Sequence, residues 1–133
     1  MTEQELQQYI RQRYPEENAR CEWKEMKNLK NSFNGKEGND VLSYVSAIAN
    51  MEGGELVIGI KDKTLDIVGT DLSALTFNGF MATPLTATFK LVEQCVNLSS
   101  EGLRIEEFVT DDSNKTVWII HIPKHKPRRP VYA

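Results

Sequence analysis

The chain has few cysteines and no long apolar run, and each scarcity excludes a class of protein. Its 133 residues hold only two cysteines, Cys21 and Cys95, which lie far apart and outside any C-x-x-C pattern. We therefore expect reduced thiols in a cytoplasmic protein rather than a disulfide framework. No apolar run approaches the ~20 residues of a membrane span, and the polar, acidic start is not a secretory signal. One domain spanning residues 1–133 is long enough to bury its own core without a disulfide or a metal.

Several catalytic patterns are also missing. Gly35-Lys36 does not belong to a P-loop, because the motif would need glycine where Lys30 stands and a hydroxyl where Glu37 stands. His121 and His125 have H-x-x-x-H spacing, but a proline lies between them, so they cannot share a helical face as in a zinc protease. We expect His121 to pack in or beside the sheet. No nucleophile-elbow motif surrounds any serine.

Charge is distributed unevenly along the chain. The formal net charge is −3, with 16 basic and 19 acidic residues. Four of the basic residues, and no acid, lie in residues 124–133, which carry +4 and leave −7 on residues 1–123. The four are Lys124, Lys126, Arg128 and Arg129. A basic segment of this kind binds phosphates without reading sequence, although a solvated tail would show the same composition.

Apolar periodicity and turn residues predict helices that alternate with strands. The expected helices span residues 2–14, 40–52 and 84–97, and the expected strands span 20–27, 55–60, 67–70, 103–110 and 115–122. We expect an α/β domain of the α+β kind, whose mixed, largely antiparallel sheet has helices packed on one face. Residues 28–39 are interpreted as a loop, and residues 72–82 have no clear pattern.

The first two strands carry side-chain patterns of interest. In the first, Cys21 and Trp23 should face one way, and Glu22 and Lys24 the other. In the second, the apolar residues at positions 56, 58 and 60 should share one face. Gly59 in the middle of that strand indicates close approach by another backbone or by a ligand.

Residues 46–62 resemble the signature of the Schlafen AlbA-type domain family. They read SAIANMEGGELVIGIKD, with Ile48 and Met51 where the family usually has phenylalanine and threonine. The other similar blocks, in chain order, are CEWKE at 21–25, IVG at 67–69, HIP at 121–123 and RPVY at 129–132. Together the blocks are spread over most of the range 17–132. They imply the fold of this family and a role with nucleic acid.

The resemblance also implies a candidate catalytic set. Some members of the family are metal-dependent endoribonucleases that use two glutamates and an aspartate, and the pattern maps onto Glu17, Glu22 and Asp62, with Lys24 beside the substrate phosphate. Such a site would hold Mg²⁺ or Mn²⁺ on hard carboxylate oxygens. From spacing alone these are three acids among 19, and solvated surface carboxylates are the more common outcome.

We therefore expect a nucleic-acid-binding module, part of a transcriptional or other regulatory protein, that needs no cofactor to bind. Lys24 and Lys27 should assist the four cations of residues 124–133. Because Schlafens carry two such lobes in one chain, a single lobe should form a homodimer. The alternatives are a metal-dependent endoribonuclease and a protein-interaction or dimerisation scaffold. DNA and RNA remain equally open as partners, and we expect the domain to come from a longer protein.

Overall fold

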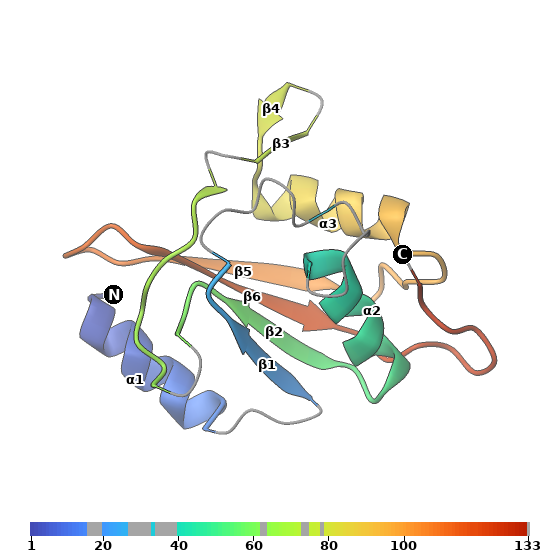
Figure 1. The fold of residues 1–133 in the computed structure, drawn as a ribbon, viewed down its shortest axis with the longest axis horizontal. Coiled ribbons are helices and arrows are strands. Elements are labelled where there is room, and N and C mark those ends of the chain that lie inside the picture. Colours follow the sequence, from blue (N-terminus) through green and yellow to red (C-terminus); the bar gives the residue numbers. More distant parts are fainter. Residues whose placement is uncertain are drawn as a thin grey trace.

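The computed structural model describes residues 1–15, 20–26, 33, 40–61, 64–72, 75–77 and 79–132 (Figure 1). Within these residues the chain forms three helices and six strands. The helices are α1 (Glu3–Arg13), α2 (Val41–Asn50) and α3 (Pro84–Gln94). The strands are β1 (Cys21–Lys24), β2 (Gly54–Ile58), β3 (Thr76–Phe77), β4 (Phe80–Met81), β5 (Arg104–Val109) and β6 (Thr116–Ile122).

Four strands form the central sheet in the order β1-β2-β6-β5. β1 and β2 pair in parallel, and the other two pairs are antiparallel, which confirms the mixed, largely antiparallel sheet. The expectation that helices cover one face was wrong. α1 packs on one face and α2 with α3 on the other (Figure 1), so each face has its own apolar core. The sheet is buried on both sides because α1 also carries an apolar stripe, Leu6 and Ile10.

The helices begin where capping side chains satisfy free backbone N–H groups. Thr2 and Glu5 form a capping box at the start of α1. Asp40 accepts a hydrogen bond from the Ser43 backbone N–H at 2.8 Å, and Thr83 caps α3 just before Pro84. The predicted starts are thereby confirmed. The end of α3 was placed too late, because the helix stops at Gln94 and Cys95 adopts an extended conformation.

Gly59 ends the alternation of side chains along β2. Its φ is +104°, and an added Cβ would lie 2.8 Å from the Thr116 carbonyl oxygen, so another backbone does approach it closely. Leu56 and Ile58 face the α2 side of the sheet, whereas Ile60 packs with the core beneath α1. The expectation that position 60 shares their face was wrong, because the turn at Gly59 reverses the direction of the next side chain.

Three further segments differ from their sequence patterns. Residues 72–82, which had no clear pattern, contain the small β3–β4 hairpin. The expected strand at 67–70 is reduced to one bridge between Ile60 and Ile67. The loop expected at 28–39 lies outside the described residues except for Phe33, which is buried in the core. In the described part of the chain, none of the helices has the length and apolar character needed to cross a membrane.

Candidate nucleic-acid interface

The cations near the end of the chain stand on a tight turn. The Arg129 backbone N–H donates to the Lys126 carbonyl at 3.0 Å, which closes a four-residue turn over residues 126–129. Pro127 occupies its second position and Arg128 its third, with φ +61°, so the turn is type II. Glycine is usual at such a third position, yet here a strained backbone carries an arginine. We call residues 126–129 the basic turn.

Both ends of the basic turn are fastened to the end of α2. The His125 backbone N–H donates to the Ala49 carbonyl at 2.8 Å. The Asn50 side chain donates to the Val131 carbonyl at 2.7 Å and accepts from the Val131 N–H at 2.6 Å. These bonds fix the stems of the turn, so the cations project from a rigid base rather than from a solvated tail.

Asn50 is the residue of this region whose role the sequence did not reveal. It is the last residue of α2, directly before the chain turns through Gly53 and Gly54 into β2. The available signal was an asparagine in the Ala-Asn pair of the family signature. Its partner lies 81 residues away, so no local pattern links the two.

The basic turn brings together three cations that are not paired with an acid of the described residues. Lys126, Arg128 and Arg129 are exposed, and no carboxylate of the described residues lies within ion-pair distance of them. Five other cations are paired: Lys24 with Glu22, Lys90 with Glu93, Arg104 with Glu106, Lys115 with Glu3, and Lys124 with Glu52. The turn therefore presents positive charge that no carboxylate of the described residues neutralises.

Lys24 is the opposite case. Its Nζ lies 3.1 Å from a Glu22 oxygen and 4.8 Å from the centre of the Tyr44 ring. Burial lowers the pKa of Lys24, but hydrogen bonds to Glu22 and Tyr44 outweigh it and raise the pKa above its ordinary value. Glu22 and Lys24 share one face of β1, as predicted, with Cys21 and Trp23 on the other.

Lys24 does not lie beside the basic turn. It pairs with Ile58 at one end of β2, whereas Ile122 pairs with Gly54 at the other end and the chain continues from there to Lys124. At about 3.3 Å per residue, these two pairings are about 13 Å apart along β2, and the basic turn lies beyond the end of β6. In Figure 1 the segment after β6 lies at the right, away from the end of β1. The other predicted site residues, Glu17, Lys27 and Asp62, lie outside the described residues.

A histidine between two carboxylates lies on the α1 face of the sheet. His121 Nε2 is 2.5 Å from a Glu106 oxygen, and its Nδ1 is 3.7 Å from a Glu55 oxygen. Because the carboxylates approach different ring nitrogens, they do not converge on one cation. Among the described residues no group of three or more histidine, cysteine or acidic side chains is arranged to hold a metal ion. The side chains of this cluster connect β2, β6 and β5. His121 lies beside the sheet, as expected.

Comparison with known proteins identifies the family. The family model described as Schlafen, AlbA_2 matches residues 17–133. The chain belongs to this family. Its matched region contains both the α2–β2 signature and the basic turn with its Asn50 anchor. Membership of the Schlafen AlbA_2 family indicates a function related to nucleic acid.

The similar solved structures include one of low sequence identity. The DIP2311 protein from Corynebacterium diphtheriae is 17% identical, with a TM-score of 0.45. The similarity covers 84% of this chain and 21% of that protein, so the chain spans about a fifth of its length. No curated protein matches the chain.

Proposed function

We propose that this Schlafen AlbA_2 chain is a nucleic-acid-binding module of a transcriptional or other regulatory protein, and that the basic turn holds the phosphate backbone of its ligand. The observation that carries the proposal is the unpaired, exposed charge of Lys126, Arg128 and Arg129 on a turn whose stems are anchored by Asn50. Lys124 adds a fourth cation at the edge, partly neutralised by Glu52 at 3.3 Å.

The chemistry of these side chains suits phosphate. Arginine offers a planar fork of N–H donors that matches two phosphate oxygens, and lysine offers a compact charge. A short, anchored turn loses little conformational freedom when it binds, which favours affinity. Contacts of this type release counterions from the nucleic acid, so binding should weaken with salt and depend little on base sequence. Binding by the turn needs no cofactor.

The test compares two triple variants that remove the same amount of charge. The first replaces Lys126, Arg128 and Arg129 with glutamine. The control replaces three exposed arginines on or near the α1 face: Arg11, Arg13 and Arg104. Binding to a short DNA duplex and to a structured RNA is measured by fluorescence anisotropy across a salt series.

We expect the turn variant to lose at least about tenfold in affinity, and the slope of log K against log salt to fall by about three. The control should keep its affinity within about twofold and its slope within about one unit. Equal losses in both variants would show that net charge alone governs binding, and the assignment to the turn would be wrong. A folded wild-type chain that binds neither probe at low salt would contradict the proposed function itself.

A metal-dependent endoribonuclease is the second candidate, favoured by the placement of Glu22 and Lys24 side by side on one face of β1. Glu22 would hold Mg²⁺ or Mn²⁺ together with Glu17 and Asp62, and Lys24 would contact the substrate phosphate. The metal would supply an activated water for phosphodiester cleavage. Chelator-sensitive cleavage of structured RNA in Mn²⁺ by the wild type, lost in Glu22→Gln and Asp62→Asn, would support this candidate. Binding without cleavage under either ion would reject it.

A further inference from the structure

The outer face of α3 is apolar although it faces solvent. Leu85, Phe89 and Val92 follow one another at spacings of four and three residues, which places them on one stripe of the helix. The core face of the same helix is formed by Ala87 and Leu91, which are fully buried. Leu85 and Phe89 are 65% and 66% exposed. This helix therefore has two apolar faces, and the protein's own core covers only one.

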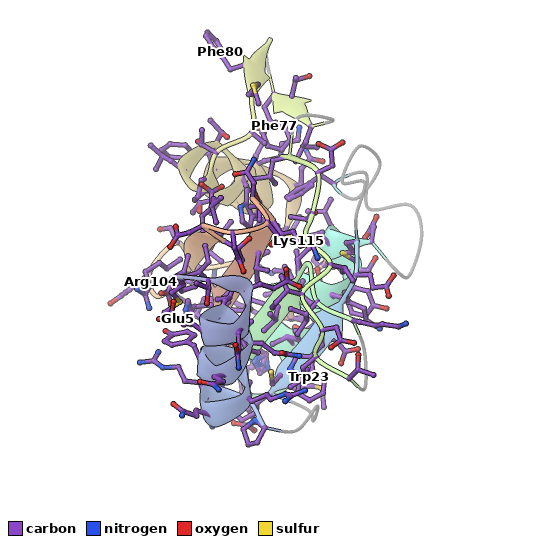
Figure 2. The ribbon with its side chains drawn as sticks, turned by 90° about the vertical axis from the view of Figure 1, so that its left-hand side faces the viewer. Glu5, Trp23, Phe77, Phe80, Arg104 and Lys115 are labelled. Carbon is purple, nitrogen blue, oxygen red and sulfur yellow. The ribbon has the colours of Figure 1, made fainter. Side chains whose placement is uncertain are left out.

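The apolar surface continues beyond both ends of α3. At the start of the helix the β3–β4 hairpin adds Phe80 and Met81, and Figure 2 shows Phe80 projecting away from the body of the molecule. A groove of about 360 Å³ separates the hairpin from α3, and both Phe80 and Phe89 line it. At the end of the helix Val96 bridges to Tyr132, and both are exposed. We call this set the α3 surface; its exposed apolar members are Phe80, Met81, Leu85, Phe89, Val92, Val96 and Tyr132.

The size of the α3 surface is close to what a stable dimer needs. An aromatic side chain presents about 200 Å² and an aliphatic one somewhat less, so these seven residues expose roughly 700 Å² together. A standard interface buries about 800 Å² on each partner. This surface does not suit phosphate binding, because Lys90, the cation beside the stripe, is already paired: its Nζ lies 3.9 Å from a Glu93 oxygen.

The charges beside the stripe are self-complementary. Lys90 and Glu93 both line the groove flank of α3. An antiparallel pairing of two copies that sets Phe89 against Val92 of the partner subunit also sets Leu85 against Val96 of the partner subunit. In that register Lys90 lies about 3 Å along the axis from Glu93 of the partner subunit, and its side chain, whose Nζ lies 5.9 Å from the centre of the Phe77 ring, would turn outward to form the ion pair. A twofold axis makes the same pair twice.

We propose that a second copy of this chain covers the α3 surface, in a twofold dimer built on antiparallel α3 helices. The apolar stripe supplies the buried centre and the Lys90–Glu93 pairs set the register. The proposal is independent of nucleic-acid binding, because the basic turn contributes none of these residues. It gives the expected homodimer a specific surface and a specific orientation.

The first experiment measures mass against concentration by light scattering and sedimentation, without nucleic acid. The wild type should move toward twice its 15.2 kDa within a range of about 1 to 300 µM. Phe89→Asp should weaken the dimer by about 100-fold or more, because it places a charge at the centre of the interface. Val109→Asp is the matched control, since Val109 is exposed on β5 and is not a member of the α3 surface. Circular dichroism and thermal melts establish that both variants fold.

The second experiment uses charge reversal, which separates this pairing from a nonspecific apolar association. Lys90→Glu alone and Glu93→Lys alone should each weaken the dimer by about tenfold, because each sets like charges against one another twice. The double variant should recover wild-type affinity. An equal mixture of the two single variants should form a heterodimer, since its charges are again complementary.

Several results would overturn the proposal. One is a wild type that stays monomeric across the whole range, which would assign the surface to a different protein or to another segment of a longer chain. Another is a dimer that survives Phe89→Asp, which would place the interface elsewhere. Equal weakening by Val109→Asp, or no rescue in the charge-reversed double variant, would reject the antiparallel α3 arrangement.

Discussion

Lys24 and the basic turn are two basic regions at opposite ends of one sheet, and they differ in what surrounds their charges. Lys24 is held between the Glu22 carboxylate and the Tyr44 ring. Lys126, Arg128 and Arg129 have no acidic partner among the described residues and stand on an anchored turn. A count of basic residues would predict phosphate binding in both regions. The ion pairs distinguish them, because a lysine that already contacts a carboxylate gains little binding energy from a phosphate.

Among single substitutions, the largest expected effect comes from breaking the Asn50 anchor of the basic turn. Asn50→Ala removes two hydrogen bonds to Val131 at a partly buried position. We expect a loss of about 1–3 kcal/mol in the free energy of unfolding. Nucleic-acid affinity should also fall by several-fold, although no charge has changed, because the turn loses its rigid base. Urea unfolding and anisotropy at one salt concentration measure the two effects.

Asn97→Gly is the control for the anchor. Asn97 donates one exposed hydrogen bond to Pro130 and has φ +68°, which glycine tolerates. It should change affinity less than Asn50→Ala does. Equal effects from the two substitutions, or unchanged affinity in Asn50→Ala, would mean that the rigidity of the turn is unimportant.

The next largest effect is a gain in nucleic-acid affinity, obtained by removing the acidic partner of Lys124. Lys124 Nζ lies 3.3 Å from a Glu52 oxygen at the edge of the basic turn. Glu52→Gln should release Lys124 to contact phosphate, which would raise affinity by about threefold and steepen the salt slope by about one unit. Glu3→Gln breaks a comparable ion pair, with Lys115 Nζ at 3.2 Å beside the start of β6, and should leave the slope unchanged. A gain of similar size in both would attribute the effect to net charge.

A smaller effect is expected at Lys24, which lies outside the proposed nucleic-acid interface. Lys24→Gln should change nucleic-acid affinity by less than about twofold, because its charge is already paired and lies far from the turn. Titration of the duplex and the RNA against this variant measures it. A loss of affinity comparable to that of a single substitution in the basic turn would place Lys24 in the nucleic-acid interface as well.

The smallest effect concerns a third cation, Lys115, whose pairing serves stability. Glu3 accepts hydrogen bonds from Ser113 and from Lys115, and these lower its pKa below the ordinary 4.5. The stabilising contribution is therefore present above that ordinary value and is lost as the pH falls through the lowered pKa. Glu3→Gln should show a shallower decline in melting temperature between about pH 6 and pH 3 than the wild type. Parallel declines would contradict this assignment.

The sequence predicted the features that depend on near neighbours. The alternation of Cys21 and Trp23 against Glu22 and Lys24, and the start of α2 near Asp40, follow from patterns within a few residues. Features set by distant contacts were missed. Asn50 meets Val131 only in the folded chain, and the β3–β4 strands are too short to show a period.

Two predictions were wrong for related reasons: the direction of the Ile60 side chain and the restriction of the helices to one face of the sheet. The reversal of Ile60 needs the positive φ of Gly59, which alternation alone does not include. The stripe of α1 was visible, but its place opposite α2 is a matter of packing. For the candidate site, composition located the basic segment, while its turn type and its anchors depend on tertiary structure.

Mapping the bound surface by NMR is the most direct test of whether nucleic acid binds at the basic turn. Backbone amides of the ¹⁵N-labelled chain are followed while a short DNA duplex or a structured RNA is titrated in. We expect the largest shifts on residues 124–131 and on Ala49 and Asn50, which anchor them, with little change at residues 22–24. Shifts concentrated on β1 and on the start of α2, with the basic turn unchanged, would contradict this expectation.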